Sequence, residues 1–371
     1  MPAPTLRIPT MILLRHPKID NPQGQRKRDD MSTLYDSNLR AMEVLGTLLG
    51  RRVYFEPLGG NNGDILLEHA SRRALSDAGV EATEDEVGAD VIVINGGGGM
   101  KDGCRQVLAA LRRHARAQPE RELIILPSSF WMREFDLAAL LRPRRAPTTI
   151  FARERVSLDF LQKLDLPDTC RLGLDCDMAL TLRGSEFITS LKSRGGHRHV
   201  LIAERSDIES PAGARLKPIG SRALNRWIPR TVKTSLKRLI NRRRERRWAT
   251  GNPTVQRIRT YVDHHVPGVV SLPTLASDVS DTGIADFEGF CQAIADAAAV
   301  ATNRLHVALL ASMLDKPTFM LDNTYFKLRA VYEYALQDHP HVQYVTSKCL
   351  QDGGDETTSG ELANKEDRVV E

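Results

Sequence analysis

The sequence contains no run of about 18 apolar residues, the length that a helix needs to cross a membrane. Its 371 residues are 41% hydrophobic and 27% charged, a composition typical of soluble globular proteins. The N-terminal segment holds an apolar patch of only four residues with no small-residue cleavage site after it, so it does not match a signal peptide. We therefore expect a soluble protein that stays in the cytoplasm.

Cysteine is scarce as well. The five cysteines are odd in number, widely spaced and free of any C-x-x-C pair, which argues against a disulfide framework and against a zinc site. The histidines at positions 197, 199, 264 and 265 do not have the spacing of a common metal site either. We expect reduced thiols and no bound metal.

Positive charge is concentrated in one segment. Residues 222–247 contain eleven Lys or Arg and one Glu, a charge of +10 in a chain whose formal net charge is +5. Their apolar side chains fall near one helical face, which resembles a helix lying on an anionic membrane surface. A solvated helix and an anion-binding lid over a cleft are the alternatives. No recognition motif supports nucleic-acid binding, so we expect no nucleic-acid partner.

Short β-rich runs alternate with helical stretches, which predicts parallel α/β architecture with crossover helices. The length fits two domains of about 150 to 200 residues. We expect strands at 52–57, 90–95, 122–127, 148–152 and near 178–182, and then at 200–204, 269–272, 299–302, 317–321 and 342–345.

The small, polar and basic segment 191–199 predicts a domain linker. We therefore expect an N-terminal Rossmann-like domain at 1–190, a C-terminal one at 191–350 with a basic insert at 210–252, and a disordered acidic tail at 351–371. Two facing doubly wound domains would bind ligands in the cleft outside the carboxyl ends of their strands.

An arginine and a histidine begin an otherwise apolar helix. If Asn303 caps that helix, Arg304 is its first residue and His306 its third. The helix N-terminus carries about half a positive charge, so a cation there is unfavourable unless an anion binds beside it. The same field favours a neutral His306, ready to take a proton from a hydroxyl. The alternative is that Arg304 caps a carbonyl and His306 is an interior histidine.

Two glycine-rich turns end strands at the same edge. Asn61 and Asp64 belong to the first, G-G-N-N-G-D, which is neither a Walker A nor a G-x-G-x-x-G motif. Its glycines would let the backbone approach a ligand. Alternatively, the run is a tight turn in which Asp64 favours the helix start. Gly97 and Gly98 lie in the second, N-G-G-G-G, where we weigh ligand contact against a sharp turn.

Further polar side chains follow strands at the predicted edge. Arg153 follows 148–152 and begins a helix with Ser157, and Arg205 follows 200–204. Each is a candidate contact for an anionic substrate. The alternative for Arg153 is a surface arginine, and the alternative for Arg205 is an interdomain ion pair. Asn323 and Lys327 follow 317–321 and could reach the same anion.

The run T-N-R-L-H-V-A-L-L-A-S-M-L-D-K-P-T-F-M-L-D-N-T-Y-F-K-L-R resembles the most characteristic block of the polysaccharide pyruvyl transferase family. GGNNGDILLEHA, INGGGG, FARERVSLDFL, DCDMAL and AERSDIES resemble other blocks of that family, in the expected order over residues 52–336. The resemblance is loose at 210–252, and Met178 stands where the family has a proline.

This resemblance implies two Rossmann-like domains similar to a GT-B glycosyltransferase. It implies transfer of a pyruvyl group from phosphoenolpyruvate to two hydroxyls of one sugar, giving a pyruvate ketal without a cofactor. The acceptor would be an exopolysaccharide or a lipid-linked oligosaccharide, which would bring the enzyme to the inner face of the membrane. Arg304 and Arg153 would bind the donor, and His306 and Asp64 would act in catalysis. The alternatives are a GT-B glycosyltransferase that uses a nucleotide sugar, and a catalytically idle, membrane-associated assembly component.

Overall fold

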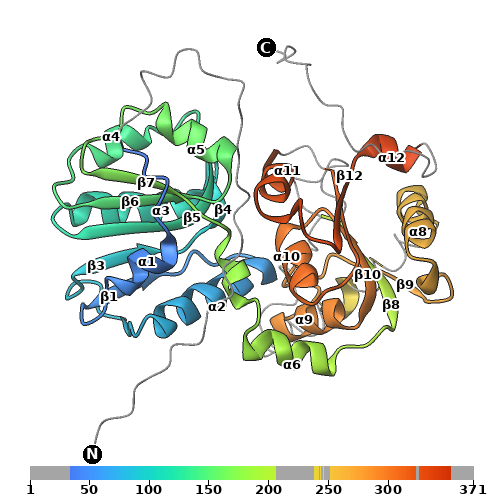
Figure 1. The fold of residues 1–371 in the computed structure, drawn as a ribbon. Coiled ribbons are helices and arrows are strands. Elements are labelled where there is room, and N and C mark those ends of the chain that lie inside the picture. Colours follow the sequence, from blue (N-terminus) through green and yellow to red (C-terminus); the bar gives the residue numbers. More distant parts are fainter. Residues whose placement is uncertain are drawn as a thin grey trace, which may run out of the picture. The chain divides into compact units, whose positions relative to one another are not determined.

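The computed structural model describes residues 34–205, 238–241, 243, 245, 251–322 and 326–351 (Figure 1). The described residues belong to one compact unit. Two β-sheets lie within this unit, and every strand pair in both is parallel. The predicted parallel α/β class is therefore confirmed.

The first sheet has seven strands in the order β2-β1-β3-β5-β6-β7, with β4 beside β5. Its strands are β1 (Val53–Glu56), β2 (Ala82–Thr83), β3 (Val91–Ile94), β4 (Gly97–Lys101), β5 (Glu122–Trp131), β6 (Thr148–Ala152) and β7 (Cys170–Leu174). The second sheet has five strands in the order β12-β11-β10-β8-β9. Its strands are β8 (His199–Ala203), β9 (Thr274–Ala276), β10 (Ala297–Thr302), β11 (Thr318–Leu321) and β12 (Val342–Val345).

Helices make most of the connections between consecutive strands, as parallel pairing requires. In the first half they are α1 (Ala41–Gly46), α2 (Asn62–Asp77), α3 (Arg105–Ala117), α4 (Leu137–Leu141), α5 (Arg155–Gln162), the 3-10 helix η1 (Met178–Leu182) and α6 (Glu186–Arg194). In the second half they are α8 (Pro253–His265), the 3-10 helix η2 (Pro267–Val269), α9 (Phe287–Ala295), α10 (Leu305–Met313), α11 (Phe326–Val331), the π-helix η3 (Tyr332–Leu336) and α12 (Ser347–Gln351).

Both faces of each sheet are buried. Successive side chains of a strand point to opposite faces, and in β3 Val91 and Val93 join one apolar cluster while Ile92 and Ile94 join another. Helices α1 and α2 supply the first cluster, and α3, α4 and α5 supply the second (Figure 1). Because both faces of the sheet are covered, its strands are continuous apolar runs in the sequence, rich in Val and Ile.

One apolar cluster joins the two sheets. It contains Leu66 and Leu67 of α2 together with Val307 and Leu310 of α10. Helix α10 is apolar on every side and its residues 307–313 are all buried, as expected of a helix enclosed by other elements. The enclosure gives the start of α10 a rigid support.

Three predicted elements differ from the structure. Residues 178–182 form the 3-10 helix η1 rather than a strand, because the Asp177 side chain accepts a hydrogen bond from the Ala179 N–H and caps a turn there. Residues 269–272 are not a strand, and β9 begins two residues later, after Pro273. The glycine run, for which ligand contact and a sharp turn were weighed, contributes the start of strand β4. Apolar runs this short do not distinguish a strand from a turn of helix.

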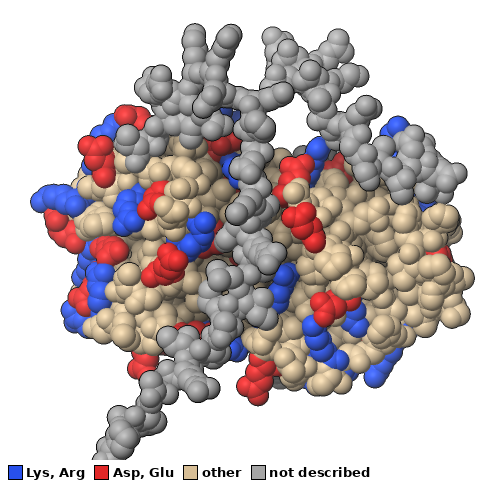
Figure 2. All heavy atoms as spheres, in the orientation of Figure 1, with Lys and Arg blue, Asp and Glu red and all other residues tan. Residues whose placement is uncertain are grey.

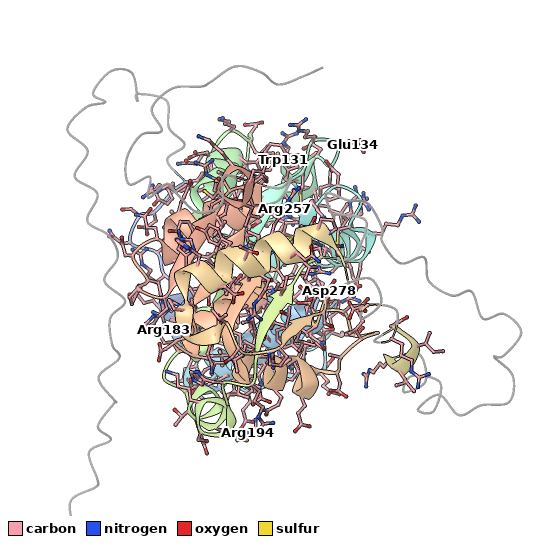
Figure 3. The ribbon with its side chains drawn as sticks, turned by 90° about the vertical axis from the view of Figure 1, so that its right-hand side faces the viewer. Trp131, Glu134, Arg183, Arg194, Arg257 and Asp278 are labelled. Atoms are coloured by element: carbon pink, nitrogen blue, oxygen red, sulfur yellow. The ribbon has the colours of Figure 1, made fainter. Side chains whose placement is uncertain are left out.

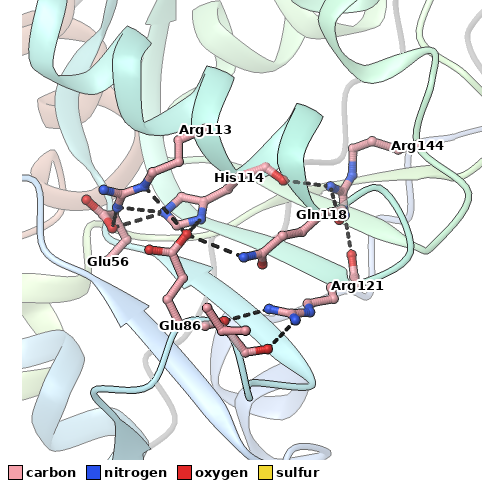
Figure 4. Close-up of polar contacts among 8 residues, drawn as sticks. Glu56, Glu86, Arg113, His114, Gln118, Arg121 and Arg144 are labelled. Carbon is pink, nitrogen blue, oxygen red and sulfur yellow. Dashed lines mark hydrogen bonds and ion pairs between the residues drawn. The ribbon is translucent and has the colours of Figure 1, made fainter.

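A buried polar cluster fixes helix α3 to the first sheet (Figure 4). His114 is fully buried, with Nε2 3.0 Å from Glu56 Oε2 and Nδ1 3.4 Å from Glu86 Oε1. Burial alone would raise the pKa of the Glu56 carboxyl, but His114 and the Arg113 guanidinium outweigh it and lower the pKa. The buried Arg144 guanidinium donates to the carbonyls of residues 114, 118 and 121. These contacts hold the helix whose other end lines the cavity discussed below.

Surface charge is mixed over the described part of the face in Figure 2, where basic and acidic side chains alternate. Most of the basic segment 222–247 and the tail after Gln351 lie outside the described residues. No helix in the described part of the chain is long and apolar enough to span a membrane. The division into two domains at residue 191 and the GT-B arrangement stay predictions.

Candidate active site

A cavity of about 280 Å³ lies where strands of both sheets end. Residues that follow the carboxyl ends of β1, β3, β6, β8 and β10 line it: Leu58, Asn95, Arg153, Arg205 and Asn303. The carboxyl edge of a parallel sheet is where α/β proteins bind their ligands. The cavity is therefore the candidate active site.

The first turn of α2 forms one wall. The Asn61 side chain accepts a hydrogen bond from the Gly63 N–H at 2.7 Å, and Asp64 Oδ2 accepts one from the Asn61 N–H at 2.8 Å. Together they make a capping box, the arrangement that satisfies the unpaired N–H groups of a helix start. Gly60 has φ of 135°, and a Cβ there would clash with the Asp64 carboxylate. Asp64 thus favours the helix start, the alternative stated above, and also lines the cavity.

The start of α10 forms another wall, but the helix begins one residue later than predicted. Arg304 is the N-cap and His306 the second helical residue, because Asn303 does not cap the helix. The Asn303 Oδ1 instead accepts a hydrogen bond from the Arg205 N–H at 2.7 Å, and Thr302 Oγ1 accepts one from the Arg304 N–H at 3.0 Å. Among the described residues no side chain caps α10, and the first N–H groups of a helix have no intrahelical acceptor.

The Arg304 guanidinium is paired with a buried carboxylate of the protein. Its Nε and Nη2 donate to Asp278 at 3.0 and 2.5 Å, and both side chains are nearly fully buried. The unfavourable position of a cation at a helix N-terminus is therefore offset first by Asp278. Arg304 still lines the cavity, but a bound anion would share its fork with that carboxylate.

A second buried carboxylate, Asp177, faces two predicted site residues. Its Oδ2 lies 2.6 Å from Arg153 Nη1 and 3.6 Å from His306 Nε2. The His306 ring also lies against Gly63, where a Cβ would be 2.6 Å from Nδ1. Gly63 thus leaves the space that the imidazole occupies. Arg153 precedes α5 rather than beginning it, since Glu154 is the N-cap.

Asp177 is fully buried and ionised. Burial would raise the pKa of its carboxyl, but His306 and Arg153 outweigh burial and hold the pKa well below its usual range. Arg153 is held further by Ser129, whose Oγ accepts from Nε at 2.8 Å. The Asp177 carboxylate therefore holds the guanidinium of Arg153, which follows β6. The same carboxylate faces the imidazole of His306 at the start of α10.

Lys327 brings another cation to the same place. Its Nζ donates to the Gly98 carbonyl at 2.6 Å, and a Cβ at Gly98 would lie 3.2 Å from Arg153 Nη2 and 3.8 Å from Lys327 Nζ. Burial, followed by the charges of Arg153 and Lys101, lowers the pKa of Lys327 to about 7. A bound anion would restore its positive charge.

A model of the polysaccharide pyruvyl transferase family matches residues 28–325 of the chain. The chain belongs to the polysaccharide pyruvyl transferase family. The family indicates a transferase that places pyruvyl groups on a polysaccharide. The structure is similar to the crystal structure of an uncharacterised protein from Klebsiella pneumoniae, with a TM-score of 0.53 and 18% identity over 83% of this chain and all of that one. This likeness shows the fold alone. None of the curated proteins compared with the chain matches it.

The structure brings most of the predicted site residues together. The cavity lining includes Asn61, Asp64, Gly98, Arg153, Arg205, Arg304, His306 and Lys327. Gly97 is not part of it, because it begins β4 and lies against Leu67 of α2. Asn323 lies outside the described residues. The roles of these residues stay predictions.

Sequence reasoning missed the two buried carboxylates and the cavity-lining Lys101 and Ser280. The only signal for Asp177 was its place in the DCDMAL block, and nothing in the sequence pointed to Asp278. The described residues contain no group of three or more His, Cys, Asp or Glu side chains able to hold a metal ion.

Proposed function

We propose that this polysaccharide pyruvyl transferase takes the pyruvyl group from phosphoenolpyruvate and closes it as a ketal on two hydroxyls of one sugar. The observation that supports this donor is the charge of the cavity. Asp64 is the one carboxylate among the described lining residues. Five basic side chains line the cavity: Lys101, Arg153, Arg205, Arg304 and Lys327.

The balance of charges suits a small, highly charged anion. The described lining residues carry five basic side chains and one carboxylate, and the carboxylates of Asp177 and Asp278 hold Arg153 and Arg304. Phosphoenolpyruvate carries a phosphate and a carboxylate on three carbons. The uncapped start of α10 adds N–H donors of the kind that bind phosphate.

The size of the cavity points the same way. Its volume of about 280 Å³ lies just below the usual range of ligand pockets, roughly 300 to 1,000 Å³. A three-carbon phosphorylated acid fits this volume better than a nucleotide sugar does. This comparison favours pyruvyl transfer over glycosyl transfer.

The chemistry follows from the residues around the donor. A proton added to the donor's methylene carbon makes the neighbouring carbon electrophilic, and a sugar hydroxyl attacks it while a base takes the hydroxyl proton. The second hydroxyl then displaces phosphate, which leaves with the second proton. The basic side chains stabilise the charge on the departing phosphate. His306 serves one of the proton transfers, and Asn61 and Asp64 contact the sugar from the α2 wall. The reaction needs no cofactor.

We further propose that the acceptor is carried on a lipid and that the basic segment 222–247 contacts an anionic membrane. The described part of this segment exposes two apolar side chains, Leu239 at 48% and Ile240 at 38%. Exposed apolar groups among many basic residues are typical of helices that bind anionic bilayers.

The donor is tested by incubating the protein with phosphoenolpyruvate and a saccharide acceptor. Phosphate release should match the gain of an acid-labile carboxylate on the saccharide, measured by mass spectrometry. His306→Ala should lower the rate about 10²- to 10⁴-fold, the usual contribution of a general acid or base. His264→Ala, a change of an exposed histidine, should have no effect. A saccharide that gains a sugar from a nucleotide donor instead would contradict the proposal.

Binding of phosphoenolpyruvate should depend on pH through Lys327. Because the pKa of Lys327 is about 7 before the anion binds, binding above pH 7 should take up a proton, and affinity should fall as the pH rises from 7 to 9. Calorimetry in two buffers of different ionisation enthalpy measures the uptake. Lys327→Arg should bind without this pH dependence. Proton-neutral binding by the unaltered protein would show that Lys327 does not respond to the anion.

Membrane contact should require the exposed apolar side chains of the basic segment. The protein should sediment with vesicles that contain anionic lipid, and salt should release it. Leu239→Ser should weaken sedimentation several-fold, whereas Leu49→Ser, which removes a leucine that is 68% exposed elsewhere, should not. Equal binding to neutral vesicles, or none to either kind, would rule out this contact.

A further inference from the structure

Three side chains attach the described end of the basic segment to one stretch of chain, residues 277–286. Arg238 Nη1 lies 3.0 Å from Asp286 Oδ2, and Asn241 Nδ2 donates to the Gly283 carbonyl at 3.0 Å. The third is Glu245, the one acidic residue among the eleven basic residues of 222–247. Glu245 contacts Ser277 and Asp278, at the end of this stretch nearest to β9.

Glu245 is buried, with 5% of its surface exposed, and both of its carboxylate oxygens are used. Oε2 accepts from Ser277 Oγ at 2.6 Å, and Oε1 accepts from the Asp278 N–H at 3.0 Å. Burial raises the pKa of this carboxyl to about 7, so its place in the interior is costly. A solvated surface helix would have no need of such a contact.

Asp278, whose N–H donates to Glu245, is also the partner of Arg304. Asp278 follows β9 (Figure 3), and its carboxylate accepts both donors of the Arg304 fork. Just beyond it, the Ser280 carbonyl accepts from the Asn62 N–H at 2.9 Å, and the carbonyls of Val279 and Ala285 accept from the Asn62 side chain at 3.0 Å each.

This stretch therefore reaches both helix starts that wall the cavity. Asp278 holds the N-cap residue of α10, and residues 279–285 hold the first turn of α2. Glu245 fixes the end of the stretch that carries Asp278. The contacts form one path from the basic segment through Asp278 to the Arg304 guanidinium.

We propose that Glu245 is a positioning residue for the donor site, acting on Arg304 through Ser277 and Asp278. The proposal rests on the proposed function, because the anion that Arg304 faces is taken to be phosphoenolpyruvate. It makes Glu245, in the described part of the basic segment, a support of the active site.

The test compares three variants. Glu245→Ala leaves the Asp278 N–H and Ser277 without their acceptor, and should weaken phosphoenolpyruvate binding about tenfold, the size expected for the net loss of about one buried hydrogen bond. Glu245→Gln should bind nearly as well as the unaltered protein, because its amide oxygen can accept from Asp278 and its NH₂ can donate to Ser277. Asn241→Ala removes an anchor of the same helix that does not touch Ser277 or Asp278, and should leave affinity unchanged.

A second readout does not depend on the donor. The NMR resonance of the Arg304 Nε–H, assigned with Arg304→Lys, should shift in Glu245→Ala and stay in place in Glu245→Gln and Asn241→Ala. An unchanged resonance in Glu245→Ala, or equal changes in Glu245→Ala and Asn241→Ala, would overturn the positioning role. If the unaltered protein binds no phosphoenolpyruvate, the proposed function fails, and the resonance still decides the role of Glu245.

Discussion

A single buried carboxylate, Asp177, is the contact on which the proposed active site depends. It follows β7 of the first sheet, holds Arg153 at 2.6 Å and lies 3.6 Å from the His306 imidazole of α10. An ionised carboxylate without exposure to water is stable only when positive groups and donors surround it. The Asp177 carboxylate therefore holds the Arg153 guanidinium in place and faces the His306 imidazole at one edge of the cavity.

The helix dipole of α10 imposes a second electrostatic constraint on the site. Arg304 sits at the positive end of this dipole, and Asp278 supplies the negative charge that makes the position tolerable. The two buried carboxylates hold Arg153 and Arg304, and Lys101, Arg205 and Lys327 also line the cavity. The buried carboxylates thus hold two arginines in fixed positions at the cavity.

The sequence predicted the strands with continuous apolar runs, such as 148–152 and 342–345, because burial on both faces leaves a clear pattern. It failed at 178–182, where a capped 3-10 turn has the same composition as a strand. Cavity residues such as Asp64 and His306 could be predicted because each follows a strand at the carboxyl edge. The partners Asp177 and Asp278 could not, since they pair with residues 24 and 26 positions away along the chain in contacts that no local pattern encodes.

The most direct test of the central contact is the free energy of unfolding of Asp177→Asn against pH. A carboxyl whose pKa is lowered in the folded protein contributes stability above its unfolded pKa of about 3.9, and that stability is lost as the pH falls further. The variant should therefore be about 3 to 5 kcal/mol less stable at pH 7, with the difference narrowing below about pH 4. Asp165→Asn, which breaks an exposed pair with Arg142, should cost about 1 kcal/mol or less. A difference for Asp177→Asn that is small at pH 7, or that does not change with pH, would contradict the account.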